Sequence, residues 1–324
     1  MANFSDPIDS QQAIINDLTT TKGASVWGDR LFTVLVRGLA FSGSLFLLLI
    51  GWIVFQDAQP AMKAFGLGFF WSQDWDVGKL QFGGLPYIYG TLVSSALALF
   101  FAVPLGLAVA LTTSENFVPD WVRSPVAFLV ELIASIPSVI IGLWGIFILI
   151  PILKPLQEVL FKTFAWFPLF STEPFGPSTL IAGVVLGIMI LPTIAAIGRD
   201  ALRAVAPELR SASMALGATR WETIFRVLLP TASSGIIGAI ILALGRALGE
   251  TMAVTMVIGN STIISPSLIA PGYTIPAVLA NQFPEAFEEL HIGALMYLAL
   301  ILFIITLVVN SLAVLLVELV KSNR

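Results

Sequence analysis

The sequence contains no cysteine and a single histidine, His291. The absence of cysteine excludes disulfide bonds, thiolate metal sites and cysteine nucleophiles, and one histidine does not make a histidine-based metal site. Charged residues are also scarce, at 11% of 324 residues, whereas a typical soluble domain has about 25%. So low a charged fraction is typical of an integral membrane protein. We expect no catalytic site, no metal site and no cofactor in this chain.

Two common sequence signatures are missing as well. Asp6, Asp9 and Asp17 precede the first apolar run, which begins near Leu31, whereas a secretory signal starts with a short basic region and a brief apolar core. The first apolar run is therefore expected to be retained as a membrane span. No Gly-x-x-x-x-Gly-Lys-Ser/Thr motif occurs, so the chain is not expected to bind ATP as phosphate-loop proteins do.

Long apolar runs dominate what is present, and 57% of the residues are hydrophobic. Several runs exceed the roughly 18 residues that indicate a membrane span. Backbone groups in lipid must be hydrogen-bonded within their own segment, which favours helices. The sequence predicts an all-α integral membrane protein with six transmembrane helices, near residues 31–55, 87–113, 126–153, 178–198, 234–259 and 293–319.

Basic residues are distributed unevenly between the two sides. With a cytoplasmic N-terminus, that side carries Lys22, Arg30, Arg123, Arg199, Arg203, Arg210, Arg220, Arg226, Lys321 and Arg324. The opposite side carries Lys63, Lys79, Lys154 and Lys162. Because Lys and Arg accumulate in cytoplasmic loops, both termini are expected to be cytoplasmic.

The loop between the fourth and fifth spans contains clear helix signals. Pro207 suits the first turn of a helix, and Thr219 with Glu222 forms the pattern of a capping box. Gly217, between them, allows the left-handed backbone that ends a helix. We therefore expect two short helices, bent at Gly217, that project from the membrane.

The projecting helices would expose several apolar side chains, namely Leu209, Met214, Leu216, Trp221 and Phe225. Exposed apolar patches are typical of surfaces that dock another protein. An amphipathic hairpin lying on the lipid surface is the alternative. The residues alone leave both open.

The fifth predicted span carries two charges, Arg246 and Glu250. If the span starts near Ser234, Arg246 lies roughly 18 Å along it at 1.5 Å per residue, near the middle of a ~30 Å apolar core. Glu250 would then lie one turn further on the same face. The pair either forms a permanent ion pair that fixes helix register, or Arg246 lines a path and binds an oxyanion.

Two glycines flank these charges. Gly245 and Gly249 form a small-xxx-small pair, which lets another helix approach closely. We expect them to serve helix packing.

The run SASMALGATRWETIFRVLLP, residues 211–230, resembles the loop shared by permease subunits of bacterial ATP-binding cassette importers. The family pattern is a Glu-Ala-Ala triplet, then a glycine, then Ile-x-Leu-Pro. The triplet falls here on Ser211-Ala212-Ser213, the glycine on Gly217 and the tail on Val227–Pro230. The glycine, the tail and their spacing match, but Ser211 replaces the family glutamate.

Three further stretches narrow the resemblance: ELIASIPSVIIGLWGIF (131–147), ILPTIAAIGRDALRAV (190–205) and GRALGETMAVTMVIGN (245–260). Together they are similar to PstC-type permeases of phosphate-specific transport systems, over about residues 31–320. The resemblance implies a type I importer permease (MetI-like) fold in the bacterial plasma membrane. It also implies pairing with a PstA-type permease, two copies of a subunit that binds ATP and Mg²⁺, and a periplasmic phosphate-binding protein.

The resemblance further implies residue roles. Arg246 and Glu250 would belong to the phosphate path. The ATP-binding subunits would dock on Ser211, Ala212, Ser213, Ala215, Leu216, Gly217, Ala218, Thr219 and Trp221.

The expected organisation has three parts and no nucleic-acid partner. Residues 1–30 form an N-terminal cytoplasmic segment, and residues 31–86 form the first span and a periplasmic loop. Residues 87–320 form the permease core, which includes a coupling loop at 199–232. Alternatives that stay open are a permease for sulfate or molybdate, a secondary transporter driven by an ion gradient, and a structural anchor. No inverted repeat between the two halves is evident, which disfavours the secondary transporter.

Overall fold

The computed structural model describes residues 25–115 and 118–322. The contacts divide the chain into two units, residues 1–53 and 54–324, and each is considered by itself. Of the predicted N-terminal segment 1–30, residues 1–24 lie outside the described residues. The predicted divisions at residues 30 and 86 stay predictions.

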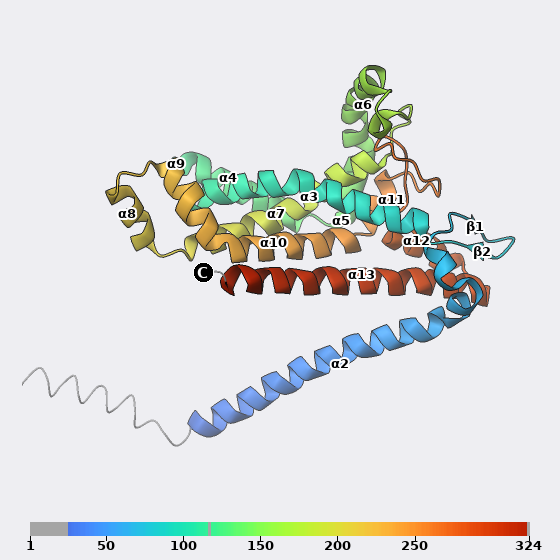
Figure 1. The fold of residues 1–324 in the computed structure, drawn as a ribbon, viewed down its shortest axis with the longest axis horizontal. Helices are drawn as coiled ribbons and strands as arrows, with labels where there is room; N and C mark the ends of the chain where they lie inside the picture. Colours follow the sequence, from blue (N-terminus) through green and yellow to red (C-terminus); the bar gives the residue numbers. More distant parts are fainter. Residues whose placement is uncertain (1–24, 116–117, 323–324) are drawn as a thin grey trace, which may run out of the picture. The chain divides into compact units, whose positions relative to one another are not determined.

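Nearly all regular structure in the described residues is helical (Figure 1). In chain order the elements are α2 (Ser25–Phe65), η1 (Gly66–Phe70), β1 (Trp75–Asp76), β2 (Gln81–Phe82), α3 (Leu85–Ser114), α4 (Asp120–Ser135), α5 (Ser138–Trp144), η2 (Gly145–Leu149), α6 (Ile150–Phe164), η3 (Pro168–Phe170), α7 (Thr179–Arg203), α8 (Pro207–Ala215), α9 (Arg220–Thr223), η4 (Ile224–Leu228), α10 (Leu229–Gly249), α11 (Met252–Val257), α12 (Ile275–Gln282), η5 (Phe283–Glu285) and α13 (Glu289–Ser322). The two short strands pair in an antiparallel hairpin.

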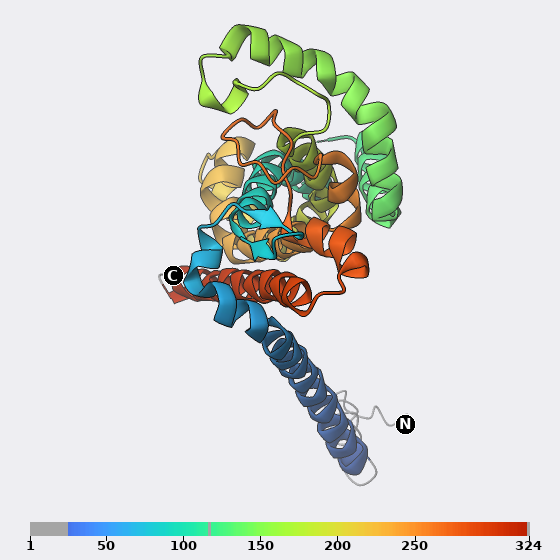
Figure 2. The ribbon, with the colours of Figure 1, turned by 90° about the vertical axis from the view of Figure 1, so that its right-hand side faces the viewer.

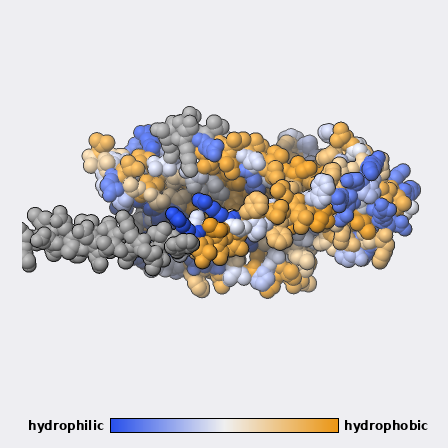
Figure 3. Space-filling model, turned by 90° about the horizontal axis from the view of Figure 1, so that it is seen from below, coloured by the Kyte–Doolittle hydropathy of each residue, from blue (hydrophilic) through white to orange (hydrophobic). Residues whose placement is uncertain are grey.

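The number of predicted membrane spans is confirmed. Within the described residues, six helical stretches are long and apolar enough to cross a membrane: Gly28–Phe70, Leu85–Ser114, Ser138–Phe164, Thr179–Arg203, Arg220–Gly249 and Glu289–Leu315. Their surfaces carry many exposed Leu, Ile, Val and Phe side chains. On the face shown in Figure 3, hydrophobic residues cover most of the length of the helices and hydrophilic residues gather mainly toward the ends.

The boundaries of the third span are wrong in the prediction. The predicted range 126–153 runs across a break, because α4 ends at Ser135 and a new helix begins at Ser138. Pro137 explains the break, since proline disfavours the helical conformation in the residue before it; Ile136 has an extended ψ of 127°. After the break, α5 and η2 pack against α7 and α11, and the stretch then curves away from them through α6 (Figure 2).

The boundaries of the fifth span are also wrong in the prediction of 234–259. Helices α9, η4 and α10 form one continuous stretch, Arg220–Gly249, which ends before Glu250. The second helix of the predicted loop is therefore the first turn of the span itself. Pro230 lies in the first turn of α10, directly after the π-helical segment η4.

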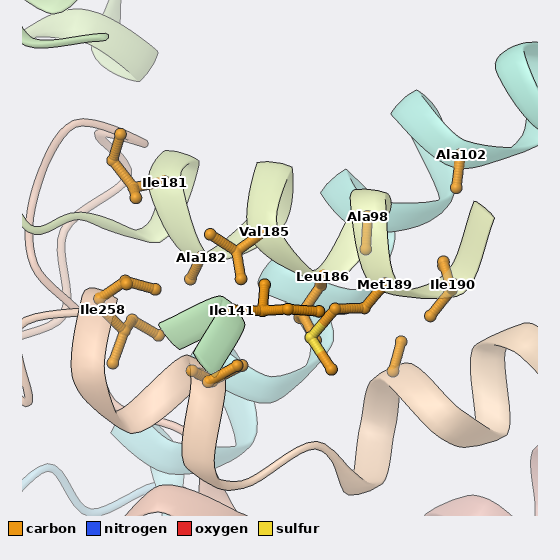
Figure 4. Close-up of a cluster of buried hydrophobic side chains, with 14 of the residues drawn as sticks. Ala98, Ala102, Ile141, Ile181, Ala182, Val185, Leu186, Met189, Ile190 and Ile258 are labelled. Atoms are coloured by element: carbon orange, nitrogen blue, oxygen red, sulfur yellow. The ribbon is translucent and has the colours of Figure 1, made fainter. Parts of the chain in front are cut away.

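Helix α7 is the centre of the second unit. It packs along α3 and α10, and α10 also packs against α13. Figure 4 shows Leu186 and Met189 of α7 together with Ile141 of α5, within a buried cluster that also includes alanines of α3 and α10. The small alanines let neighbouring helices approach closely.

A matched pair of glycines tests this packing. A Cβ on Gly235 would lie 2.5 Å from the Cβ of Ala201, whereas nothing lies within 4 Å of a Cβ on Gly238. We expect Gly235→Ala to lower the stability of the solubilised protein by about 1–3 kcal/mol, because the added methyl overpacks the contact between α10 and α7. Gly238→Ala, the control, should have a thermal midpoint equal to or above that of the wild type. Equal midpoints for the two variants would contradict this packing.

Candidate functional site

Arg246 lies in the last turn of α10, with its side chain exposed. Ala243, one turn earlier, and Ala247, the next residue, are buried. Among the residues that the structure describes, Arg246 has no hydrogen-bond or ion-pair partner. Its guanidinium is therefore free to meet a ligand or a second chain.

Glu250 does not share a helical face with Arg246, so the prediction of a one-turn spacing is wrong. The helix ends at Gly249, and Glu250 has an extended backbone with φ −69° and ψ 124°. Its carboxylate Oε1 accepts a hydrogen bond of 3.3 Å from the amide N of Ala253. The permanent ion pair considered from the sequence is likewise absent between these two described residues.

The break in the helix places each charge next to a helix end of opposite polarity. Arg246 lies near the C-terminal end of α10, where backbone carbonyls without helical partners favour a positive charge. Glu250 lies before α11, and its carboxylate accepts a hydrogen bond from one of the first amides of that helix. The two charges thus complement the two helix ends on either side of the break.

The break between α10 and α11 packs against α7. Ala243 and Ala247 before the break, and Ala253 after it, belong to the same buried cluster as residues 181–194 of α7. Irregular backbone within a membrane is tolerated where it is buried in protein or lines a water-filled cavity. The position of the break therefore favours a polar route next to Arg246.

The helices that follow the two breaks pack against each other. A Cβ on Gly142 of α5 would lie 3.1 Å from the Cα of Ala253 and 2.6 Å from Sδ of Met256. Only glycine permits this approach of α5 to α11. The breaks at Pro137 and Glu250 therefore belong to one region of the fold.

The glycines predicted to pack a neighbouring helix face open space within this chain. Nothing lies within 4 Å of a Cβ on Gly245 or Gly249, and the same holds for Gly238. Close packing in this chain occurs instead at Gly235, against Ala201. Packing of Gly245 and Gly249 against another chain stays a prediction.

The predicted coupling loop has the expected local structure. Gly217 has φ +89°, and the amides of Gly217 and Ala218 bond to the carbonyls of Met214 and Ser213 at 3.0 and 3.2 Å. This pattern is a Schellman motif, which ends α8. Thr219 and Glu222 form the predicted capping box at the start of α9.

We call residues 207–225, which comprise α8, α9, the turn between them and the first two residues of η4, the knob. The hydroxyls of Ser213 and Thr223 lie 3.0 Å apart and join α8 to α9. Of the predicted docking residues, Ser213 and Ala218 are half-buried, and the others are exposed: Ser211, Ala212, Ala215, Leu216, Gly217, Thr219 and Trp221. The structure thus places them on one small element.

Apolar side chains stand out on the knob. Leu216 is 89% exposed, and Trp221 and Phe225, each 59% exposed, stack with ring centroids 6.0 Å apart. A rigid exposed aromatic pair beside an exposed leucine suits a docking surface.

Sequence reasoning missed the side chains that hold the base of the knob. Arg210 bonds to Glu115 Oε1 at 3.1 Å and to the carbonyl oxygens of Leu202 and Val205 at 2.8 and 3.0 Å. Arg203 bonds to the carbonyl oxygen of Thr113 at 2.9 Å. Arg210 and Glu115 are 95 residues apart, so no local spacing could have indicated this pair.

No group of three or more His, Asp or Glu side chains in the described residues could hold a metal ion. The site consists instead of a free arginine at a break between membrane helices and a structured knob at one end of the same helical stretch. In a multi-pass membrane protein, a charged residue at a break between spans is typical of a transport path.

Comparison with known proteins gives the family. Residues 102–322 match the profile of the family described as binding-protein-dependent transport system inner membrane component. A phosphate transport system permease protein PstC from Mesorhizobium japonicum is 41% identical over 91% of this chain and 86% of its own length. PstC of Pasteurella multocida is 43% identical over 82% of this chain and 83% of its own length. A probable PstC of Methanocaldococcus jannaschii is 38% identical over 83% of this chain and 87% of its own length.

Solved structures agree on the fold. A bacterial transporter for the acidic polysaccharide alginate matches with a TM-score of 0.56 and 18% identity, over 89% of this chain and 98% of that chain. An inward-facing MetNI methionine transporter matches with a TM-score of 0.51 and 19% identity, over 74% of this chain and 94% of that chain. The predicted importer-permease fold is confirmed.

The chain belongs to the binding-protein-dependent importer permeases and, within them, to the PstC family of phosphate transport system permeases.

Proposed function

We propose that this chain forms part of the membrane path for inorganic phosphate in an ATP-driven importer and that separate subunits supply the energy. Membership of the PstC family supports phosphate as the substrate. The observation that carries the proposal within this chain is the exposed Arg246 side chain, which has no partner among the described residues and lies at a break between helices.

Arg246 has the chemistry that a dehydrating phosphate needs. A guanidinium presents planar, paired N–H donors that match two oxygens of a phosphate, and it keeps its charge in any protein environment. Glu250 bonds to a backbone amide of α11, so its carboxylate does not have to be displaced from Arg246 before the anion binds. In this proposal Glu250 holds the break open and limits how tightly the anion is trapped.

The open face of α10 is where a second permease would complete the path. Gly238, Gly245 and Gly249 have no neighbour within 4 Å of a Cβ position, and they recur along one side of the helix, next to Arg246. Small residues let a partner helix approach closely. We propose a PstA-type permease as that partner.

The knob is proposed to be cytoplasmic and to dock one of two ATP-binding subunits, which hold the ATP and Mg²⁺. The basic residues of the loops favour this orientation, with both termini in the cytoplasm. A periplasmic phosphate-binding protein would deliver the anion to the opposite side. The chain itself carries out no catalytic step.

Vesicles containing the purified chain, with and without a PstA-type permease and an ATP-binding subunit, test the proposal. With the phosphate-binding protein present, we expect ATP-dependent uptake of radioactive phosphate only when all partners are present. Phosphate uptake by the chain alone, driven by an ion gradient, would replace the proposal with a secondary transporter. Faster uptake of sulfate or molybdate than of phosphate would reassign the substrate.

A further inference from the structure

A cluster of three arginines lies at the base of the knob, away from the break at Glu250. Arg203, Arg210 and Arg220 line an open hollow of about 420 Å³ between the end of α3, the end of α7 and the two knob helices. Glu115 is the one acidic side chain in the described lining. The lining therefore carries three positive charges and one negative charge.

The donors in this hollow are not all used. Arg210 bonds to Glu115 and to two carbonyl oxygens, but its Nε is buried without a hydrogen-bond partner. One nitrogen of Arg203 bonds to the carbonyl oxygen of Thr113. Arg220 is exposed and has no ion pair or hydrogen bond among the residues that the structure describes.

The arrangement has the requirements of an anion site. Guanidinium groups donate charge-assisted hydrogen bonds to phosphate oxygens, often two at a time. Glu115 already offsets the charge of Arg210, so Arg203 and Arg220 supply the excess positive charge. The hollow is far larger than the volume that one carboxylate side chain needs, and it suits a group with several oxygens.

We infer that this hollow binds a phosphate-type oxyanion, carried either by free phosphate or by the headgroup of an anionic phospholipid. The hollow lies where α3 and α7 end as membrane spans. Basic pockets between helices at the cytoplasmic face bind anionic headgroups. Because the hollow also includes residues of α8 and η4, the bound anion joins the knob to the span ends and stiffens the element that would transmit force.

The inference is independent of the phosphate path at Arg246, so the two proposals fail separately. The test uses the full chain, purified with its co-purifying subunits and stripped of lipid. In one arm inorganic phosphate is added against chloride at equal ionic strength, and in the other phosphatidylglycerol is added against phosphatidylcholine in micelles. The thermal unfolding midpoint reports binding, since a ligand of the folded state raises it.

The variant Arg203→Gln/Arg220→Gln keeps the Arg210–Glu115 pair, and Arg226→Gln is the matched control from the same helical stretch, outside the lining. We expect the double variant to weaken binding by about tenfold or more, because each substitution removes a charge-assisted donor of the anion. Arg226→Gln and Arg246→Gln should leave binding at the hollow unchanged. Arg220→Gln alone serves if the double variant misfolds.

The ligand that binds saturably to the wild type and loses this binding in the double variant identifies the source of the anion. Saturation by phosphatidylglycerol assigns a headgroup site, and saturation by inorganic phosphate assigns a site for the free ion. Absence of saturable binding in both arms would overturn the inference. So would binding that depends on Arg226 or Arg246 as strongly as on Arg203 and Arg220.

Discussion

Arg246→Gln is expected to reduce ATP-dependent phosphate uptake by at least about a hundredfold. The substitution removes two paired, charge-assisted donors, each worth roughly 1.5–3 kcal/mol when a dehydrated anion depends on them. Because Arg246 is exposed and has no partner among the described residues, its loss should leave the fold intact. Uptake of radioactive phosphate in vesicles containing the complete complex measures the effect.

Two further measurements separate a path role from a structural role. The Arg246→Gln complex should remain assembled and retain ATP hydrolysis, since the knob lies elsewhere on the chain. Arg246→Lys should also transport poorly, because an ammonium lacks the planar pair of donors. Arg226→Gln is the matched control, an exposed arginine of the same helical stretch, and should transport normally. Normal uptake by an assembled Arg246→Gln complex would exclude Arg246 from the path.

Gly217→Val should release the ATP-binding subunit and with it all ATP-dependent uptake. Gly217 has φ +89°, a conformation that costs a residue with a side chain on the order of 1–3 kcal/mol and is worst for β-branched residues. The Schellman turn between α8 and α9 would then rearrange and move the docking surface. Co-purification of the ATP-binding subunit with the tagged chain measures the loss. If the backbone strain is released only by moving the docking surface, the affinity for the subunit should fall by about tenfold or more.

Gly66→Val is the matched control for backbone strain. Gly66 also has a positive φ, of +53°, and nothing lies within 4 Å of its Cβ position, but it is the first residue of η1 and does not belong to the knob. It should destabilise the protein without releasing the subunit. Leu216→Asp tests the surface without backbone strain, because the side chain is 89% exposed. Retention of the subunit by both Gly217→Val and Leu216→Asp would exclude the knob as its docking site.

Local chemistry made the knob predictable from the sequence. Pro207, Gly217 and the capping box at Thr219 each act over four residues or fewer, and each has its expected geometry in the structure. The number of spans was predictable for a similar reason, because an apolar run long enough to cross a membrane has few other stable conformations.

The breaks within the apolar runs were not placed correctly, because composition does not change across them. Pro137, which separates α4 from α5, was the available signal for the third span. At Glu250 the signal is weaker still. The carboxylate caps α11 by bonding to the amide of Ala253, but the same spacing also fits a continuous helix.

Contacts distant in sequence could not be predicted at all. The Arg210–Glu115 pair joins the base of the knob to the end of α3, and it depends on the way α3 and α7 pack. The hollow lined by Arg203, Arg210 and Arg220 is a consequence of the same packing. Interactions of this kind are set by the tertiary fold and not by the spacing of residues along the chain.

The account depends most on whether water and anions reach position 246, and the lack of cysteine in the chain makes this directly measurable. Arg246→Cys in the assembled complex would be exposed to a charged, membrane-impermeant thiol reagent, with and without ATP. Ala243→Cys is the control, because Ala243 lies one turn earlier and is 0% exposed. We predict that the cysteine at position 246 is modified in at least one nucleotide state, while the cysteine at position 243 stays unmodified. Equal protection of both positions in every nucleotide state would contradict a path beside Arg246.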